Sequence, residues 1–180
     1  MSKAQIRKKV LKFRQNINKL NRPFQTEKIF KLIKKIKLKK KIIGCYYPVN
    51  FEANIINLIK KLQKNNYLVC LPIIHKGHKM DFYEYKENEF FYVNNFGIPE
   101  PLKSKKLLPN IILIPIVAFD KNLNRIGYGG GFYDRFINKM KKKKLIKIGL
   151  AFSCQKVNRI ETNKFDKKLD FIITEKNVYK

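Results

Sequence analysis

The chain has few cysteines and no long apolar run. Its three cysteines, Cys45, Cys70 and Cys154, are scattered over 180 residues. Their odd number and wide spacing match neither a disulfide framework nor a zinc motif, so we expect a reducing compartment, the cytoplasm. No stretch approaches the roughly 20 apolar residues needed to cross a membrane, and the first residues contain no apolar signal-peptide core. We therefore expect no membrane association.

Acidic residues are also scarce. There are 13 Asp and Glu residues against 41 Lys and Arg residues, which leaves a formal net charge of +28. A basic surface can bind the phosphate backbone of nucleic acids. However, nearly all the positive charge is lysine spread along the chain, no RNA-binding motif is present, and abundant Lys, Asn and Ile are typical of an AT-rich genome. Compositional drift is the favoured interpretation, and the charge would also attract anionic small substrates.

Histidine is rare as well, and it does not indicate a metal site. His75 and His78 flank Gly77, with no further plausible ligand close to them in sequence. We expect both to be ordinary surface residues. Cys154 has no neighbouring base in the sequence, so it is not predicted to be a nucleophile.

The most informative segment is glycine-rich. Residues 125–135 read RIGYGGGFYDR and follow an aliphatic run at 111–117 that predicts a buried strand. The apolar residues at 132, 136, 137 and 140 fit one face of a following helix. This strand–loop–glycine–helix order is typical of a site where backbone N–H groups bind an anion, above all phosphate.

Charged residues around the glycines strengthen the phosphate interpretation. Arg125 and Arg135 bracket the loop, and Asp134 offers an oxygen ligand for Mg²⁺. The loop is neither a Walker A motif nor a dinucleotide fingerprint, because the required residues are missing. The alternative is a flexible turn that only caps a helix.

The rest of the chain alternates helices and strands. We expect a helix over 3–20, with Ile6, Val10, Phe13, Ile17 and Leu20 forming an apolar stripe and with Lys3 and Arg7 on one face. Further helices are predicted over 24–38, from Glu52 to 65, and after the glycines. Strands are predicted over 42–47, 67–74, 80–85, 107–117, 145–152 and 169–175. Pro72 should end pairing within the second of these.

Length and alternation together define a fold class. A chain of 180 residues favours one domain, spanning 1–180. Alternating strands and helices favour an α/β sheet covered by helices on both faces. In such sheets, ligands bind beyond the carboxyl ends of the strands, which is where the glycine loop would lie.

The segment RIGYGGGFYDR resembles the signature of the 5-formyltetrahydrofolate cyclo-ligase (methenyltetrahydrofolate synthetase) family. That family usually has Tyr-Tyr-Asp where this chain has Phe132, Tyr133 and Asp134. Further segments match in the same order, including the Lys3–Arg7 pair and the Gly-Ile-x-Glu-Pro segment at 97–101. The family pattern Pro-x-Glu-x-His-Asp is altered at 161–166, where the proline is missing and Phe165 replaces the histidine.

The resemblance implies a three-layer, mostly parallel sheet flanked by helices, of the sugar-isomerase and CoA-transferase type. It implies ATP- and Mg²⁺-dependent cyclisation of 5-formyltetrahydrofolate to 5,10-methenyltetrahydrofolate, with release of ADP and phosphate. The protein would be a monomer whose partners are ATP and the folate. No covalent nucleophile is implied.

The resemblance also implies site residues. The residues expected to bind ATP are Lys3, Arg7, Arg125, Gly127, Tyr128, Gly129, Gly130, Gly131, Phe132 and Tyr133. Those expected to bind the folate are Tyr47, Glu52, Tyr128, Gly129, Gly130, Gly131 and Phe132. Mg²⁺ would be held by Asp134 and Asp166, while Lys3 and Arg125 would stabilise the transferred phosphoryl group.

Two other function classes remain open on sequence. The first is a nucleotide-binding module of the same fold without turnover, which the altered residues Phe132 and Phe165 would favour. The second is a basic nucleic-acid-binding protein, which only the charge supports.

Overall fold

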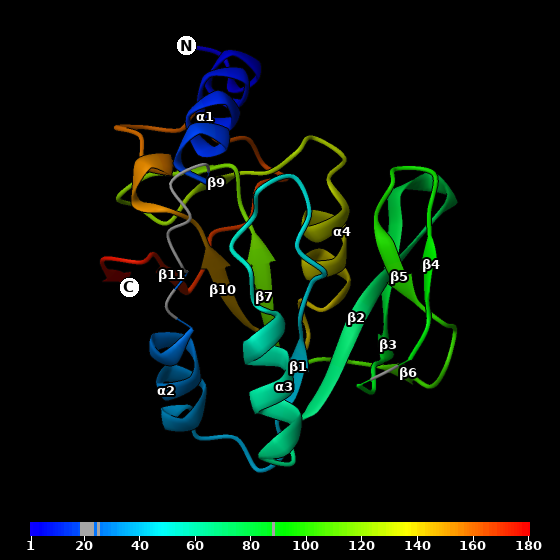
Figure 1. Cartoon of the computed structure of the whole chain (residues 1–180). Coiled ribbons are helices and arrows are strands. Elements are labelled where there is room, and N and C mark those ends of the chain that lie inside the picture. Colours follow the sequence, from blue (N-terminus) through cyan, green and yellow to red (C-terminus); the bar gives the residue numbers. More distant parts are fainter. Residues whose placement is uncertain (19–23, 25, 88) are drawn as a thin grey trace.

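The computed structural model describes residues 1–18, 24, 26–87 and 89–180. Its centre is an eight-stranded sheet with the order β12-β11-β10-β7-β1-β2-β3-β6 (Figure 1). The central strands β11, β10, β7, β1 and β2 run parallel, whereas β12 and β3 pair antiparallel with their neighbours. The expected α/β class is confirmed. The strands are β1 (Ile42–Gly44), β2 (Leu68–His75), β3 (Lys79–Glu84), β6 (Lys106–Leu107), β7 (Ile111–Pro115), β10 (Ile146–Leu150), β11 (Phe171–Ile173) and β12 (Val178–Tyr179).

The strand order changes direction between the parallel strands β1 and β7. From β1 the chain passes through α3 (Ile56–Lys64) to β2 on one side, and from β7 it passes through α4 (Phe132–Lys139) to β10 on the other. The loops that leave the adjacent strands β1 and β7 therefore diverge. This is the topological switch point at which open α/β sheets bind ligands. The loop after β7 leads to the glycines.

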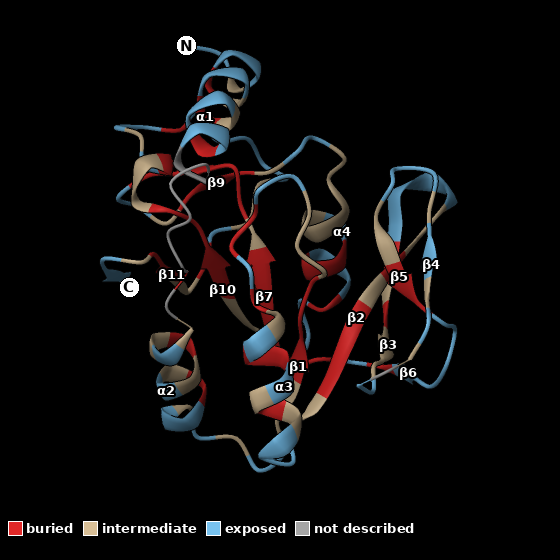
Figure 2. Ribbon diagram, viewed as in Figure 1, coloured by how far each residue is buried: buried red, intermediate tan, exposed pale blue. Residues whose placement is uncertain are grey.

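Buried residues line the sheet, and the outer sides of the helices are largely exposed (Figure 2). Apolar clusters lie on both faces of the sheet. One core joins α2 (Glu27–Lys35) and α3 to the sheet, with Ile29, Ile33 and Leu58 almost fully buried. The other core joins α4 to the opposite face through Phe136 and Ile137. Burial of such side chains stabilises each by roughly 1.5–3 kcal/mol.

The first helix lies beyond the carboxyl ends of the strands, above the arrowheads of β7 and β10 (Figure 1). Helix α1 (Lys3–Asn18) packs Ile6 and Val10 against Val117, Ala118 and Ile126. The expected apolar stripe is wrong at Phe13, which is 51% exposed, while Arg14 is 1% exposed. Ile6, Val10 and Arg14 are each four residues apart, so the buried face of the helix carries an arginine as its third residue. The expected positions 19 and 20 lie outside the described residues.

Strand β2 continues past Pro72 to His75, so the expectation that pairing ends at the proline is wrong. The Cys70 carbonyl accepts the Cys45 N–H, so the backbone groups of Cys70 face β1. Residues two apart in a strand face the same side, and β1 ends at Gly44, before it reaches Pro72. The N–H that Pro72 lacks would therefore have had no partner on β1. On that side the hairpin β4 (Phe91–Val93) and β5 (Pro99–Pro101) covers the edge. Buried Glu100 accepts hydrogen bonds there from Ile74 N and Asn94 Nδ2, at 2.9 and 2.7 Å.

Several predicted boundaries were also wrong. Helix α3 begins at Ile56 instead of Glu52, because the Asn54 side chain accepts the Ile56 N–H and residues 50–51 form a turn. The predicted strand 107–117 is divided into β6 and β7. A short ribbon, β8 (Ala118–Phe119) and β9 (Arg125–Ile126), connects β7 to the glycines. Across the described ranges, no helix combines the length and apolarity that a membrane span needs.

Candidate functional site

The glycine loop joins β9 to α4 at the carboxyl end of the sheet. Gly129 and Gly131 have φ values of 107° and 67°, which residues other than glycine rarely adopt. Gly131 is the N-cap of α4 and its carbonyl accepts the Arg135 N–H at 3.1 Å. A Cβ on Gly127 would meet no atom within 4 Å, so the loop is open on that side. The first N–H groups of a helix have no partner within the helix, so this helix start favours an anion.

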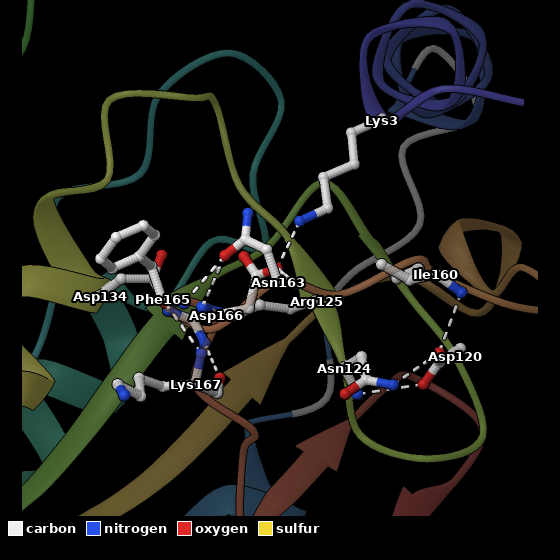
Figure 3. Close-up of polar contacts among 10 residues, drawn as sticks. All are labelled: Lys3, Asp120, Asn124, Arg125, Asp134, Ile160, Asn163, Phe165, Asp166 and Lys167. Atoms are coloured by element: carbon white, nitrogen blue, oxygen red, sulfur yellow. Dashed lines mark hydrogen bonds and ion pairs between the residues drawn. The ribbon is translucent and has the colours of Figure 1, made fainter.

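Buried polar side chains hold the backbone that leads into the loop through hydrogen bonds. Asp120 is fully buried, and its carboxylate accepts hydrogen bonds from Asn124 N and Nδ2 and from Ile160 N, at 2.9–3.0 Å (Figure 3). It also accepts the Asn122 N–H at 2.9 Å. Gln155 donates to the carbonyls of Ile116 and Val117, just after β7. These bonds connect the chain before the glycines to the segment that carries residues 161–167.

Arg125 and Asp134 form a partly buried ion pair next to the loop. Arg125 Nη2 lies 2.7 Å from Asp134 Oδ1, and the Arg125 side chain is only 5% exposed. Asp134 also accepts the Lys167 N–H at 3.2 Å, while Arg125 donates to the Lys167 carbonyl. Figure 3 shows these groups converging on residues 165–167. The pair therefore fixes the start of α4 against the chain that follows Asp166.

Lys3 lies on the other side of the same segment. Its Nζ is 2.5 Å from Asp166 Oδ2, which also accepts the Asn163 N–H (Figure 3). Partial burial acts to raise the pKa of Asp166, but the hydrogen bonds from Lys3 and Asn163 outweigh it and lower the pKa below its usual value. Arg7 donates from Nε to the Gly127 carbonyl at 2.8 Å. The structure thus brings Lys3, Arg7, Arg125, Asp134 and Asp166 together around the loop.

One helix supplies three of the cations around the site. Residues 3, 7 and 14 are separated by four and by seven positions, so they share one face of α1. Lys3 reaches Asp166, Arg7 reaches the glycine loop, and Arg14 reaches the turn after β1. The sequence interpretation missed Arg14. The signal was the repeat Ile6–Val10–Arg14, but an arginine in such a repeat is normally exposed.

Glu52 lies in the turn after β1, across from the glycines, and is 8% exposed. Its Oε2 accepts the Val49 N–H at 3.0 Å, so Glu52 closes a turn instead of opening a helix. Burial raises the pKa of Glu52 to about 7, although the Val49 N–H, Arg14 and Tyr128 act in the opposite direction. Burial and the Glu52 charge also raise the pKa of Tyr133. Glu52, Tyr128 and Tyr133 therefore form one electrostatic cluster.

The remaining expected residues lie at the margin of this cluster. The Phe132 ring is 5.4 Å from the His78 ring and 6.4 Å from Phe96 on the β4–β5 hairpin. Tyr47 packs against Phe91, with ring centroids 4.8 Å apart. A separate groove of about 260 Å³ lies at the opposite, amino-terminal end of β2, lined by residues such as Tyr67 and Glu87. That groove lacks glycines and cations in a phosphate-binding arrangement, so the switch point is the better candidate site.

The two candidate metal ligands suit Mg²⁺. Asp134 and Asp166 provide carboxylate oxygens on neighbouring segments, since Asp134 bonds Lys167 N directly after Asp166. Among the described residues, no group of three or more potential metal ligands occurs. Mg²⁺ commonly uses one or two carboxylates and completes its shell with water and substrate phosphates. The donor set therefore fits a metal that arrives with a nucleotide.

Similar proteins carry one consistent description. The family model "5-formyltetrahydrofolate cyclo-ligase family" matches residues 1–175. The 5-formyltetrahydrofolate cyclo-ligase of Haemophilus influenzae is 35% identical over 175 residues, covering 91% of this chain and 92% of that protein. The cyclo-ligase of Mycoplasma genitalium is 29% identical over 177 residues, covering 96% and 98%.

A solved structure extends the similarity to the fold. The NMR structure of Aquifex aeolicus 5,10-methenyltetrahydrofolate synthetase matches with a TM-score of 0.81 and 32% identity, covering 99% of this chain and 92% of the other. The resemblance first seen in residues 125–135 thus extends over nearly the whole chain. Since both the family model and the fold match at this coverage, the chain belongs to the 5-formyltetrahydrofolate cyclo-ligase family.

Proposed function

We propose that this chain catalyses the ATP- and Mg²⁺-dependent cyclisation of 5-formyltetrahydrofolate to 5,10-methenyltetrahydrofolate, with release of ADP and phosphate. One observation carries the proposal beyond family membership. The glycine loop and the Glu52 turn leave adjacent strands at the switch point, and α1 bonds to both through Arg7 and Arg14. This arrangement suits two ligands that must meet.

The ATP half consists of the glycine loop and the cations around it. Backbone N–H groups at Gly129–Gly131 would bind phosphate oxygens, and Lys3, Arg7 and Arg125 would neutralise their charge. Lys3 and Arg125 are paired with Asp166 and Asp134 in this structure. When Mg²⁺ and phosphate bind, each carboxylate would also contact Mg²⁺ and each cation would also contact phosphate. Bound Mg²⁺ would supply further charge neutralisation at the phosphates.

The folate half consists of the Glu52 turn and the aromatic rings nearby. The Glu52 carboxylate would accept hydrogen bonds from N–H donors of the pterin ring. Rings such as Tyr128 and Phe132 offer flat surfaces for the fused rings of the ligand. Tyr47 lies on the hairpin side of the turn and would border this half.

The chemistry assigns no covalent role to the protein. The formyl oxygen attacks the γ-phosphorus of ATP, the bond from that phosphorus to the β,γ-bridging oxygen breaks, and ADP leaves. N10 then attacks the activated formyl carbon and loses its proton, and phosphate leaves with the former formyl oxygen. Phosphoryl transfer depends mainly on positioning and charge stabilisation. Lys3 and Arg125 are the side chains proposed to stabilise the transferred group.

The experiment is a turnover assay with purified protein, 5-formyltetrahydrofolate, Mg²⁺ and ATP, followed by the absorbance of the methenyl product. We expect product only when all three additions are present. ATP binding without product would favour a nucleotide-binding module. Steeply salt-dependent binding of nucleic acid without turnover would favour the nucleic-acid alternative.

A further inference from the structure

Arg14 is a buried cation on a helix whose neighbouring positions face solvent. It is 1% exposed, whereas the adjacent residues Phe13 and Gln15 are exposed. Removing a guanidinium from water is unfavourable unless its hydrogen bonds are replaced. Its Nε is buried without a hydrogen-bond partner in the part of the chain that the structure describes. Packing of α1 alone does not explain a cation at this position.

The partners of Arg14 come from two distant segments. Its Nη2 donates to the Asn50 carbonyl at 2.6 Å and to the Tyr128 hydroxyl, and its guanidinium lies 5.5 Å from the centroid of the Tyr128 ring. Asn50 belongs to the turn after β1, and Tyr128 belongs to the glycine loop. One guanidinium thus connects the two loops that diverge at the switch point.

The turn held by Arg14 has a strained backbone. Asn50 and Phe51 both have positive φ values, 48° and 60°, although neither is glycine. Directly after them, Glu52 accepts the Val49 N–H and is buried. Arg14 binds the carbonyl in the middle of this turn. The position of the Glu52 carboxylate therefore depends on a conformation that Arg14 helps to hold.

We propose that Arg14 is a positioning residue for the folate half of the site, holding the Asn50–Glu52 turn against Tyr128 of the glycine loop. The inference rests on the proposed function, since it assigns the turn to folate binding. It makes α1 a common support: Lys3 and Arg7 serve the nucleotide half, and Arg14 serves the folate half.

Electrostatics supports the same role. Among the described residues, the titratable groups that face Glu52 are Arg14 from α1, Tyr128 from the glycine loop, Tyr133 from α4 and Tyr46 just after β1. Arg14 is the cation among them. It opposes the effect of burial on the pKa of Glu52, so the carboxylate is available near neutral pH.

The test compares Arg14→Met, which removes the charge, with Arg14→Lys, which keeps it. Lys12→Met removes an exposed charge from the same helix and is the matched control. We expect Arg14→Met to raise KM for 5-formyltetrahydrofolate at least about tenfold, with KM for ATP changed less than about threefold. The acid limb of kcat/KM for the folate should move to higher pH in Arg14→Met but not in Arg14→Lys.

A second readout does not depend on turnover. Carboxyl NMR titration, with the Glu52 signal identified through its loss in Glu52→Gln, should show a midpoint near 7 in the wild type and about 1 unit higher in Arg14→Met. An equal rise of both KM values with an unmoved acid limb and midpoint would mean a merely structural role and overturn the proposal. Absence of wild-type turnover would contradict the proposed function, while the titration would still test the link between Arg14 and Glu52.

Discussion

At the scale of single residues, two cations of the candidate site are each paired with a carboxylate before any ligand binds. Arg125 faces Asp134 at 2.7 Å, and Lys3 faces Asp166 at 2.5 Å. Glu52 is different, since it is buried and its cation Arg14 bonds directly to other groups. Substitutions at paired positions must therefore be designed with the partner in mind, because a lone buried charge is strongly unfavourable.

Glu52 should give the folded protein a distinct dependence of stability on pH. Its pKa is raised in the fold from 4.5 to about 7, so the folded state binds this proton more tightly than the unfolded state. Its contribution to stability is therefore full below the unfolded pKa and is lost as the pH rises through about 7. Glu52→Gln should match the wild type at about pH 4.5 and exceed its stability by about 2–3 kcal/mol at about pH 8.5.

Urea denaturation of both proteins at the two pH values measures this difference, because other titrating groups cancel in the comparison. A gap that stays constant with pH, or that grows toward acid, would contradict the burial of an ionisable Glu52.

Asp134 has a structural partner in addition to its proposed metal. Asp134→Asn keeps an oxygen that can accept from Arg125 and Lys167, so we expect a stable protein whose Mg²⁺ affinity is at least about tenfold weaker. Asp134→Ala should lose the metal and also about 1–3 kcal/mol of stability, because the buried guanidinium of Arg125 loses an acceptor. Mg²⁺ titration of turnover and thermal denaturation separate the two effects. Wild-type Mg²⁺ dependence in Asp134→Asn would argue against the metal assignment.

Residues differ in how far the sequence could predict them. The glycines, Arg125 and Asp134 are close together in the chain, so one local pattern predicted their grouping. Arg14 was missed because its burial depends on partners 36 and 114 positions away. The sequence predicts Glu52 as a folate-binding residue but places it wrongly at a helix start. An acid before an apolar run is typical of either a helix start or a turn.

At the scale of elements, periodicity predicted the parallel strands and the helices but not the short pieces between them. The central strands are nearly continuous apolar runs, which is why β7 and β10 were found. The ribbon β8–β9 has two residues per strand and no periodicity to detect. The hairpin β4–β5 is positioned by Glu100 on the edge of β2, a long-range contact that no local pattern reveals.

The glycine loop can be tested as an element. A Cβ on Gly130 would lie 2.6 Å from Cε2 of Phe132, so Gly130→Val must displace that ring from the start of α4. We expect the dissociation constant for ATP to rise at least about tenfold, which corresponds to about 1.4 kcal/mol. Calorimetric titration with ATP measures it, and circular dichroism checks that the fold is retained. Unchanged affinity in a folded variant would count against the phosphate site.

At the scale of the whole molecule, the charge of +28 should act on association more than on chemistry. ATP and folates are anions, and a basic surface raises their rate of encounter until salt screens it. We expect kcat/KM for ATP to fall several-fold between about 20 and 200 mM NaCl, with kcat changed less than about twofold. Steady-state kinetics across this range is the measurement. A salt-independent kcat/KM would show that the excess lysines do not steer the substrate.

The central claim is that one site at the switch point brings the γ-phosphate of ATP to the formyl oxygen of the folate. The most direct measurement follows that oxygen with 5-formyltetrahydrofolate labelled by ¹⁸O in the formyl group. Mass spectrometry of the inorganic phosphate after turnover should find one ¹⁸O atom per phosphate formed. Unlabelled phosphate accompanying methenyl product would contradict the proposed transfer.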